Sequence, residues 1–267
     1  MTAVLLVVAG LLGLAIGSFL NVVVWRLPRG ESLSRPPSSC PHCGAPIRAR
    51  DNVPVVSWIV LRGRCRDCHG PISRRYPLVE LVSAVLFVGV AWWRADDATS
   101  SAAGIAHLVA LLYLVAVSVA LVLIDIEHHR LLDRIVLPSI VVALVLLGVS
   151  AGLSGDWDAW LRAFLGAAVL FTAYFMMLAV YPRGMGFGDV KLAAVLGAYL
   201  GWAGWGALVV GGFAAFLLGG VYSIGLLVAR KARRSSGIPF GPWMIVGAWL
   251  GITVGQRLWD AYLGIFD

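Results

Sequence analysis

Charged residues are scarce in this chain. Asp, Glu, Lys and Arg together make up 13% of the 267 residues, whereas hydrophobic residues make up 60%. A soluble globular domain usually contains about 25% charged and about 45–50% apolar residues. The mean hydropathy of +0.88 agrees with this imbalance. The shortage of charge excludes a soluble domain and identifies the chain as an integral membrane protein.

Regular alternation of apolar and polar residues is also weak, which argues against a membrane β-barrel. The apolar residues instead form runs close to the ~20 residues with which a helix spans a bilayer. We therefore predict an all-α polytopic membrane protein with about eight transmembrane helices. The predicted spans are residues 3–25, 78–94, 104–124, 134–152, 161–180, 190–203, 205–229 and 240–263.

Acidic residues number 14 against 21 basic ones, which gives a net charge of +7. The basic residues gather in a few loops, so the positive-inside rule explains them better than a nucleic-acid partner does. Residues 26–77 alone contain ten Arg, and this loop is therefore predicted to be cytoplasmic. The first span has no basic region before it and no small-residue cleavage site, so we interpret it as a retained anchor with its N-terminus outside.

The remaining loops follow from alternation across the membrane. They fall outside at 95–103 and 153–160, and inside at 125–133, 181–189 and 230–239. Every cluster of basic residues then lies on the cytoplasmic side, which supports an even number of spans. We expect a multi-pass protein of the cytoplasmic (inner) membrane, with the lipid bilayer as a partner and no nucleic acid.

Two aspartates stand at the ends of otherwise apolar helices. Asp125 ends the third predicted span and Asp189 opens the sixth, both at the cytoplasmic boundary. Carboxylates at the edge of hydrocarbon are costly, so they indicate function. When two carboxylates share one proton, one can accept a proton from water while the other donates to a carbonyl oxygen. We therefore predict the catalytic pair of an aspartic endopeptidase.

Two other classes of protein fit the same residues. A small proton- or cation-coupled transporter would use both aspartates as its ion site, although such sites usually lie near the membrane midplane between inverted repeats. A non-catalytic scaffold subunit is the third interpretation, and the presence of both aspartates argues against it.

Two glycines precede the second aspartate and are candidates for an active-site loop. Gly186 and Gly188 flank Phe187, and glycine permits unusual backbone angles and close approach of a substrate. A tight turn between two spans explains them equally well.

Three further residues are accessory candidates. Asp133 would lie about 12 Å from Asp125 along a continuous helix at ~1.5 Å per residue, so we interpret it as a boundary residue of the next span. Glu80 would orient the substrate or pair with a nearby Arg. Lys191 would tune the aspartate pair or extend to the membrane interface.

Cysteine is rare and confined to the loop 26–77. Its two Cys-x-x-Cys pairs are separated by 21 residues, and they comprise Cys40, Cys43, Cys65 and Cys68. Pairs at this spacing are typical of a zinc site, where four thiolates complete a tetrahedral structural centre. A cytoplasmic location disfavours disulfides, and redox-active or metal-free thiols are the alternatives. We predict a small zinc-ribbon-like loop domain between the first and second helices.

Six motifs in order resemble the prepilin peptidases, the type IV leader peptidase family of membrane aspartic proteases. They are Gly17–Val23 followed by Arg26-Leu27-Pro28, the two cysteine pairs, Arg74–Leu81, the segment from Asp125 to Asp133, Gly186–Lys191, and Ile238–Pro242. One departure is visible, since Leu132 stands where the family usually has proline. The resemblance implies that Asp125 and Asp189 are the catalytic pair.

The resemblance also implies the reaction. Members of this family remove the short basic leader of type IV prepilins or pseudopilins on the cytoplasmic side, after a glycine and just before an apolar helix. Many also N-methylate the new N-terminus with S-adenosylmethionine. This chain has no glycine fingerprint of the kind that follows a strand in nucleotide-binding folds. The expected domains are residues 1–25 as the first helix, 26–77 as the zinc loop, and 78–267 as the peptidase domain of about seven helices.

Overall fold

The computed structural model describes residues 1–182, 184–229 and 239–266. Within them the chain forms helices and no strand, apart from two isolated β-bridges in the cysteine loop. The basic residues of two predicted cytoplasmic loops, 181–189 and 230–239, lie outside the described part, as does Ile238 of the last motif; these basic residues are Arg183, Arg230, Lys231, Arg233 and Arg234.

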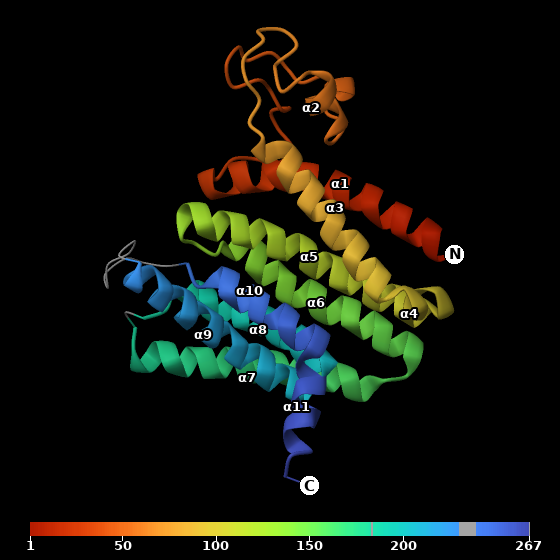
Figure 1. Ribbon diagram of the computed structural model, residues 1–267, viewed down its shortest axis with the longest axis vertical. Helices are drawn as coiled ribbons and strands as arrows, with labels where there is room; N and C mark the ends of the chain where they lie inside the picture. Colours follow the sequence, from red (N-terminus) through yellow and green to blue (C-terminus); the bar gives the residue numbers. More distant parts are fainter. Residues whose placement is uncertain (183, 230–238, 267) are drawn as a thin grey trace. The chain divides into compact units, whose positions relative to one another are not determined.

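Six of the helices are long and apolar enough to cross a membrane. They are α1 (Thr2–Arg26), α3 (Arg75–Trp93), α5 (Ala102–His128), α6 (Asp133–Ser154), α7 (Trp157–Val180) and α9 (Trp205–Val228), shown in Figure 1. The predicted class, an all-α membrane protein, is confirmed. The two other predicted spans are also helical but have a different form.

The sixth predicted span forms α8 (Phe187–Ala203), which has only 17 residues. The eighth predicted span is divided, because α10 (Gly241–Leu250) continues through a π-helical turn, Gly251–Gly255, into α11 (Gln256–Leu263). Eight transmembrane helices are therefore compatible with the structure but not established by it. The short helices α2 (Val56–Val60) and α4 (Ala95–Ser100) were not predicted.

The chain folds as two compact units. Unit 1 comprises Met1–Ser100 and Leu111–Ala120, and unit 2 comprises Ser101–Ala110 and Leu121–Asp267. The domain boundaries expected from the sequence remain a prediction. All residues around the two aspartates described below belong to unit 2, and the cysteine loop belongs to unit 1.

In unit 1, α1 and α3 pack closely along small residues. A Cβ atom added at Gly17 would lie only 2.7 Å from the Cα of Glu80, so this contact requires glycine. Nearer the cysteine loop, Asn21 Nδ2 donates a hydrogen bond to the carbonyl oxygen of Tyr76 at 3.2 Å. Small residues at helix crossings allow such close packing in membranes.

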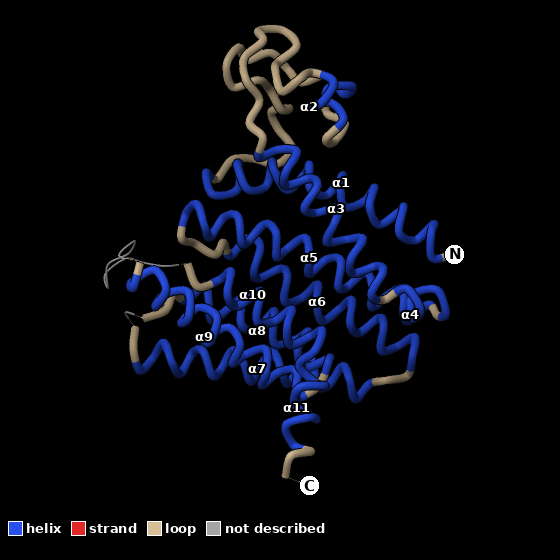
Figure 2. Tube along the Cα trace, in the orientation of Figure 1, coloured by secondary structure: helices blue, strands red, loops and turns tan. Residues whose placement is uncertain are grey.

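In unit 2, α8 is a central helix. Most of its side chains from Val190 to Gly201 are buried, and α7 packs tightly against it through glycine. The hydroxyl of Tyr199 donates to the carbonyl oxygen of Ala110 at 2.9 Å. Figure 2 shows α8 among its helical neighbours. Because protein surrounds α8, a helix shorter than a full bilayer span can hold Asp189 at the start of this core.

Candidate functional site

Asp125 lies near the C-terminal end of α5 and is 5% exposed. Its Oδ2 accepts a hydrogen bond from the backbone N–H of Gly241 at 3.1 Å, although the two residues are 116 positions apart. Gly241 is the first residue of α10, where backbone N–H groups are free and the helix dipole favours a negative charge. The start of α10 therefore positions the Asp125 carboxylate.

Asp189 lies in the first turn of α8 and is partly buried. Its Oδ2 accepts a hydrogen bond from the backbone N–H of Gly186, the residue before the helix, at 3.0 Å. An acidic side chain three residues into a helix often bonds back to the residue that precedes the helix. The backbone thus orients the second carboxylate as it does the first.

The two aspartates lie close enough to interact electrostatically. Each carboxylate has one oxygen bound to a backbone N–H, and within the described residues no hydrogen bond engages the other oxygen. Those two oxygens, Asp125 Oδ1 and Asp189 Oδ1, are thus available to a water molecule or a substrate. Proton sharing between two carboxylates requires one such oxygen on each of them.

Asp133 begins α6, as expected for a boundary residue, and its partner is Lys191. Lys191 Nζ lies 2.7 Å from Asp133 Oδ1 and 2.8 Å from Oδ2. Lys191 also lies 4.7 Å from the centre of the Phe187 ring. The ion pair joins the start of α6 to the first turn of α8, beside Asp189, and it occupies both oxygens of Asp133.

The two glycines before Asp189 differ in whether the structure has room for a side chain at their position. A Cβ atom at Gly188 would lie 2.9 Å from the Cβ of Leu131, so this position has no room for a side chain. Gly186 has φ −83°, and the nearest atom that its Cβ would meet is Asp189 Oδ2 at 3.4 Å, an ordinary contact. Unusual backbone angles, the reason suggested by the sequence, are therefore not needed at Gly186.

Tyr174 is a neighbour of the aspartates that sequence reasoning missed. It is 3% exposed on α7, interacts electrostatically with Asp189, and its ring packs 6.5 Å from that of Phe240. The sequence places Gly241 in a motif without indicating a role for it. A signal for its role was available in the Phe240-Gly241-Pro242 triplet, because proline favours the first turn of a helix.

In unit 1, the four cysteines form a compact cluster with no disulfide. The four Sγ atoms all lie within 4.8 Å of one another, and Cys40 Sγ is 3.8 Å from Cys68 Sγ. Sulfur atoms about 3.8 Å apart match the edge of a tetrahedron with Zn–S bonds of about 2.3 Å. The cluster therefore fits a zinc ion, and the 3.8 Å approach is better understood as that edge than as a hydrogen bond.

Backbone groups in the first cysteine pair favour a thiolate at Cys40. The nearby backbone N–H groups of Cys43 and His42 lower the pKa of the Cys40 thiol to about 6. A metal binds the thiolate form, so this environment favours coordination. Two ion pairs join the residues between Cys65 and Cys68 to the preceding part of the loop. They are Arg66 with Asp51 (2.6 Å) and Asp67 with Arg48 (2.8 Å). Arg66 also holds the pKa of Asp51 below its usual value.

The two cysteine pairs are copies of one turn, shifted by 25 residues. Each is closed by a β-bridge, Ser39 with Pro46 and Arg64 with Pro71. Gly44 and His69 occupy equivalent places, and both adopt positive φ, 73° and 57°. The sequence signal for this repeat is Cys-x-x-Cys-x-x-Pro-Ile, which occurs at both pairs.

Glu80 lies in α3 and is 7% exposed. Its Oε2 accepts a hydrogen bond from the backbone N–H of Val55 at 2.7 Å. Val55 has φ 62° and ψ −50°, and the N–H of Val56 bonds to the carbonyl oxygen of Pro54 at 2.6 Å. This is the rare, strained form of γ-turn, and a β-branched residue is an outlier there. Glu80 therefore ties a strained turn of the loop to a membrane helix.

Two family models match the chain. Residues 11–94 match the bacterial peptidase A24 N-terminal domain, and residues 111–224 match the type IV leader peptidase family. No solved structure matches.

Several curated proteins named prepilin leader peptidase/N-methyltransferase are similar over most of their length. The protein of Aeromonas hydrophila is 40% identical, with 96% of this chain and 93% of the relative covered. That of Stutzerimonas stutzeri is 35% identical (94% and 91% covered), and that of Neisseria gonorrhoeae is 36% identical (95% and 92% covered).

Proposed function

Because this chain belongs to the type IV leader peptidase family, we propose that it removes the basic leader of a type IV prepilin or pseudopilin, with Asp125 and Asp189 as its catalytic pair. The observation that carries the assignment is the backbone anchoring of both carboxylates, which leaves one oxygen of each available. Nothing in the comparisons supports a cation-coupled transporter.

In the proposed reaction, the pair shares one proton. The ionised aspartate takes a proton from water as the water oxygen attacks the scissile carbonyl carbon. The protonated aspartate donates to the carbonyl oxygen and yields a tetrahedral intermediate. Collapse of the intermediate breaks the C–N bond, and a proton passes to the departing amine. The backbone N–H groups of Gly186 and Gly241 keep the carboxylates in position throughout.

The proposed orientation follows the distribution of basic residues. With the Arg-rich loop 26–77 in the cytoplasm and the N-terminus outside, the ends of α5 and α8 that carry the aspartates face the cytoplasm. A substrate with a basic leader and an apolar helix would present its cleavage site at that same boundary. Cleavage there requires no extraction of the substrate helix from the bilayer.

The four cysteines would hold structural Zn²⁺, and this coordination leaves no open position for catalysis. The zinc would stabilise a loop that has little hydrophobic core of its own. We also propose N-methylation of the new N-terminus with S-adenosylmethionine, on the strength of the names of the relatives.

The test uses purified full-length protein in detergent and a prepilin-like substrate, with mass spectrometry of the products. We expect Asp125→Asn and Asp189→Asn each to lower kcat/KM by roughly 10²- to 10⁴-fold. Asp158→Asn, an exposed aspartate in the first turn of α7, is the matched control and should cleave normally. Full cleavage by either of the first two variants would overturn the assignment. Added S-adenosylmethionine should increase the product mass by one methyl group.

A further inference from the structure

The short helix α2 turns its apolar side outward. Val56, Ile59 and Val60 occupy positions i, i+3 and i+4 on one helical face, and they are 54%, 61% and 68% exposed. A helix of a water-facing loop normally turns such residues toward a core. The apolar face of α2 therefore needs a covering that the described chain does not provide.

The opposite face of α2 is fixed by polar contacts. Ser57 Oγ donates to the carbonyl oxygen of Arg50 at 3.1 Å, and Trp58 Nε1 donates to that of Ile72 at 3.1 Å. Ser57 itself is buried. Because these bonds hold the inward side of the helix, α2 cannot rotate to hide its valines and isoleucine without breaking them.

The N-terminus of α2 lies beside a membrane helix rather than beyond its end. Val55, which precedes α2, donates to Glu80, five residues after the start of α3 at Arg75. Five residues correspond to about 7.5 Å along a helix at ~1.5 Å per residue. Glu80 is also the third residue of the predicted span 78–94, so the exposed face of α2 begins at the depth where headgroups meet acyl chains.

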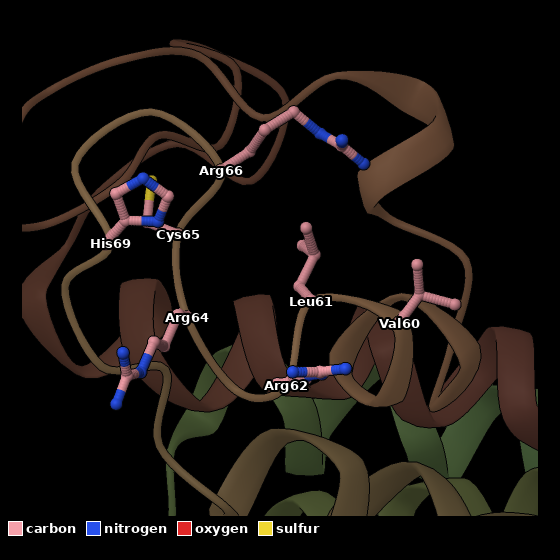
Figure 3. A pocket seen from close by; sticks show the side chains of 7 residues that line it. All are labelled: Val60, Leu61, Arg62, Arg64, Cys65, Arg66 and His69. Carbon is pink, nitrogen blue, oxygen red and sulfur yellow. The ribbon is translucent and has the colours of Figure 1, made fainter.

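A cationic pocket adjoins the C-terminal end of α2. The volume of this pocket is about 540 Å³. Figure 3 shows the side chains that line it, which are Val60, Leu61, Arg62, Arg64, Cys65, Arg66 and His69. Arg66 is paired with Asp51. For Arg62 and Arg64, no ion pair or side-chain hydrogen bond occurs within the described part of the chain. Two uncompensated guanidinium groups thus lie next to an exposed apolar face.

We propose that α2 dips into the cytoplasmic leaflet, where Val56, Ile59 and Val60 contact acyl chains and Arg62 and Arg64 bind the phosphate of an anionic lipid. An amphipathic helix with adjacent basic residues is the usual form of an interfacial membrane element. Arginine binds phosphate through its planar fork of donors. The basic leader of a prepilin would be repelled by these residues, so the lipid fits better than the substrate. This surface goes beyond the peptidase reaction and does not depend on Asp125 or Asp189.

The test places the photo-crosslinking residue p-benzoylphenylalanine at position 59 of the full-length protein. The protein is reconstituted in phosphatidylcholine vesicles with and without phosphatidylglycerol, irradiated, and analysed by mass spectrometry. A label at position 41, which is exposed in the first cysteine turn, is the matched control. We expect lipid adducts at position 59 and few at position 41. Equal adducts at both positions, or none at 59, would overturn the proposal, as would a prepilin adduct at 59 in place of lipid.

A second arm tests the two arginines. Arg62→Ala combined with Arg64→Ala should lower the preference for phosphatidylglycerol adducts roughly tenfold. Arg35→Ala combined with Arg50→Ala removes the same charge from other exposed sites of the loop and should preserve the preference. If both double variants lost the preference for phosphatidylglycerol equally, net charge alone would explain it, and the assigned phosphate site would be overturned. Bound zinc and thermal unfolding, measured for every variant, identify any that fail to fold.

Discussion

The backbone N–H of Gly241 binds Asp125 Oδ2 at 3.1 Å, and a Cβ atom at position 241 would lie 2.7 Å from that same oxygen. The hydrogen bond therefore depends on the absence of a side chain at position 241, because a Cβ atom there would collide with the oxygen that the N–H group binds. The carboxylate is positioned by a residue that has no side chain.

Gly241→Ala should therefore impair cleavage without removing any functional group. The added methyl group must displace the Asp125 carboxylate or the start of α10, and a displacement of about 1 Å can cost roughly 10²-fold in rate. Gly220→Ala in α9 is the control, because its Cβ would meet nothing within 4 Å. Measured kcat/KM of Gly241→Ala equal to that of the control would show that the close approach is irrelevant to catalysis.

The ion pair with Lys191 gives Asp133 a partner that the proposed catalytic pair, Asp125 and Asp189, does not have. The side chains of Asp133 and Lys191 are 56% and 17% exposed, so their ion pair is expected to contribute only about 0.2–1 kcal/mol to stability. Asp133→Asn should lower kcat/KM by less than about tenfold, far less than Asp125→Asn. Lys191→Met should have a similar small effect, and the double variant should show that the two losses are not additive. A loss for Asp133→Asn as large as for Asp125→Asn would make Asp133 a catalytic residue.

Gly44 and His69 occupy equivalent positions of positive φ in the two cysteine turns, so substitutions there should have opposite effects on the stability of each turn. Gly44→Ala places a Cβ atom at φ 73° and should destabilise the turn by about 1–2 kcal/mol, whereas His69→Gly relieves the same strain. Chelator competition with the zinc-loaded full-length protein should show weaker binding for Gly44→Ala and equal or tighter binding for His69→Gly. Weaker binding in both variants would mean that the His69 side chain matters more than its backbone.

The strained turn at Val55 gives a further prediction. Val55→Gly removes the steric cost of φ 62° and should raise the midpoint of thermal unfolding, whereas Val55→Ala retains a Cβ atom and should help less. Glu80→Gln should lower the midpoint, because an ionised acceptor binds the Val55 N–H more strongly than an amide oxygen does. If Glu80→Gln left the midpoint unchanged, the carboxylate would not be what holds the turn.

Much of the fold was predictable because each feature is local in sequence. Long apolar runs specify the six long helices, and the cysteine spacing specifies the cluster. The length of a span was harder to predict. Helix α8 can have only 17 residues because neighbouring helices surround it, and no local sequence pattern reveals that it is buried by them. The unpredicted helix α2 is only five residues long, too short to show a clear period.

In the candidate site, the functional side chains could be predicted from the sequence, but the backbone groups that position them could not. Asp125 and Asp189 stand out because carboxylates are rare near apolar helices. Their anchors are the backbone N–H groups of Gly241 and Gly186, so the sequence can indicate a helix start at Gly241 but not which carboxylate binds there. The partner of Asp133 was equally hidden, because Lys191 is 58 residues away and the pairing depends on how α6 and α8 begin.

The contact between Glu80 and Val55 bears on the order in which the protein is made. Val55 is synthesised 25 residues before the carboxylate that stabilises its turn, and Glu80 reaches its place only when α3 lies against Gly17 of α1. Until then the segment that carries the four cysteines has a strained turn without its hydrogen-bond partner. The turn between the two cysteine pairs is therefore expected to reach its final form only after α1 and α3 have packed together, which places the completion of this loop after membrane insertion.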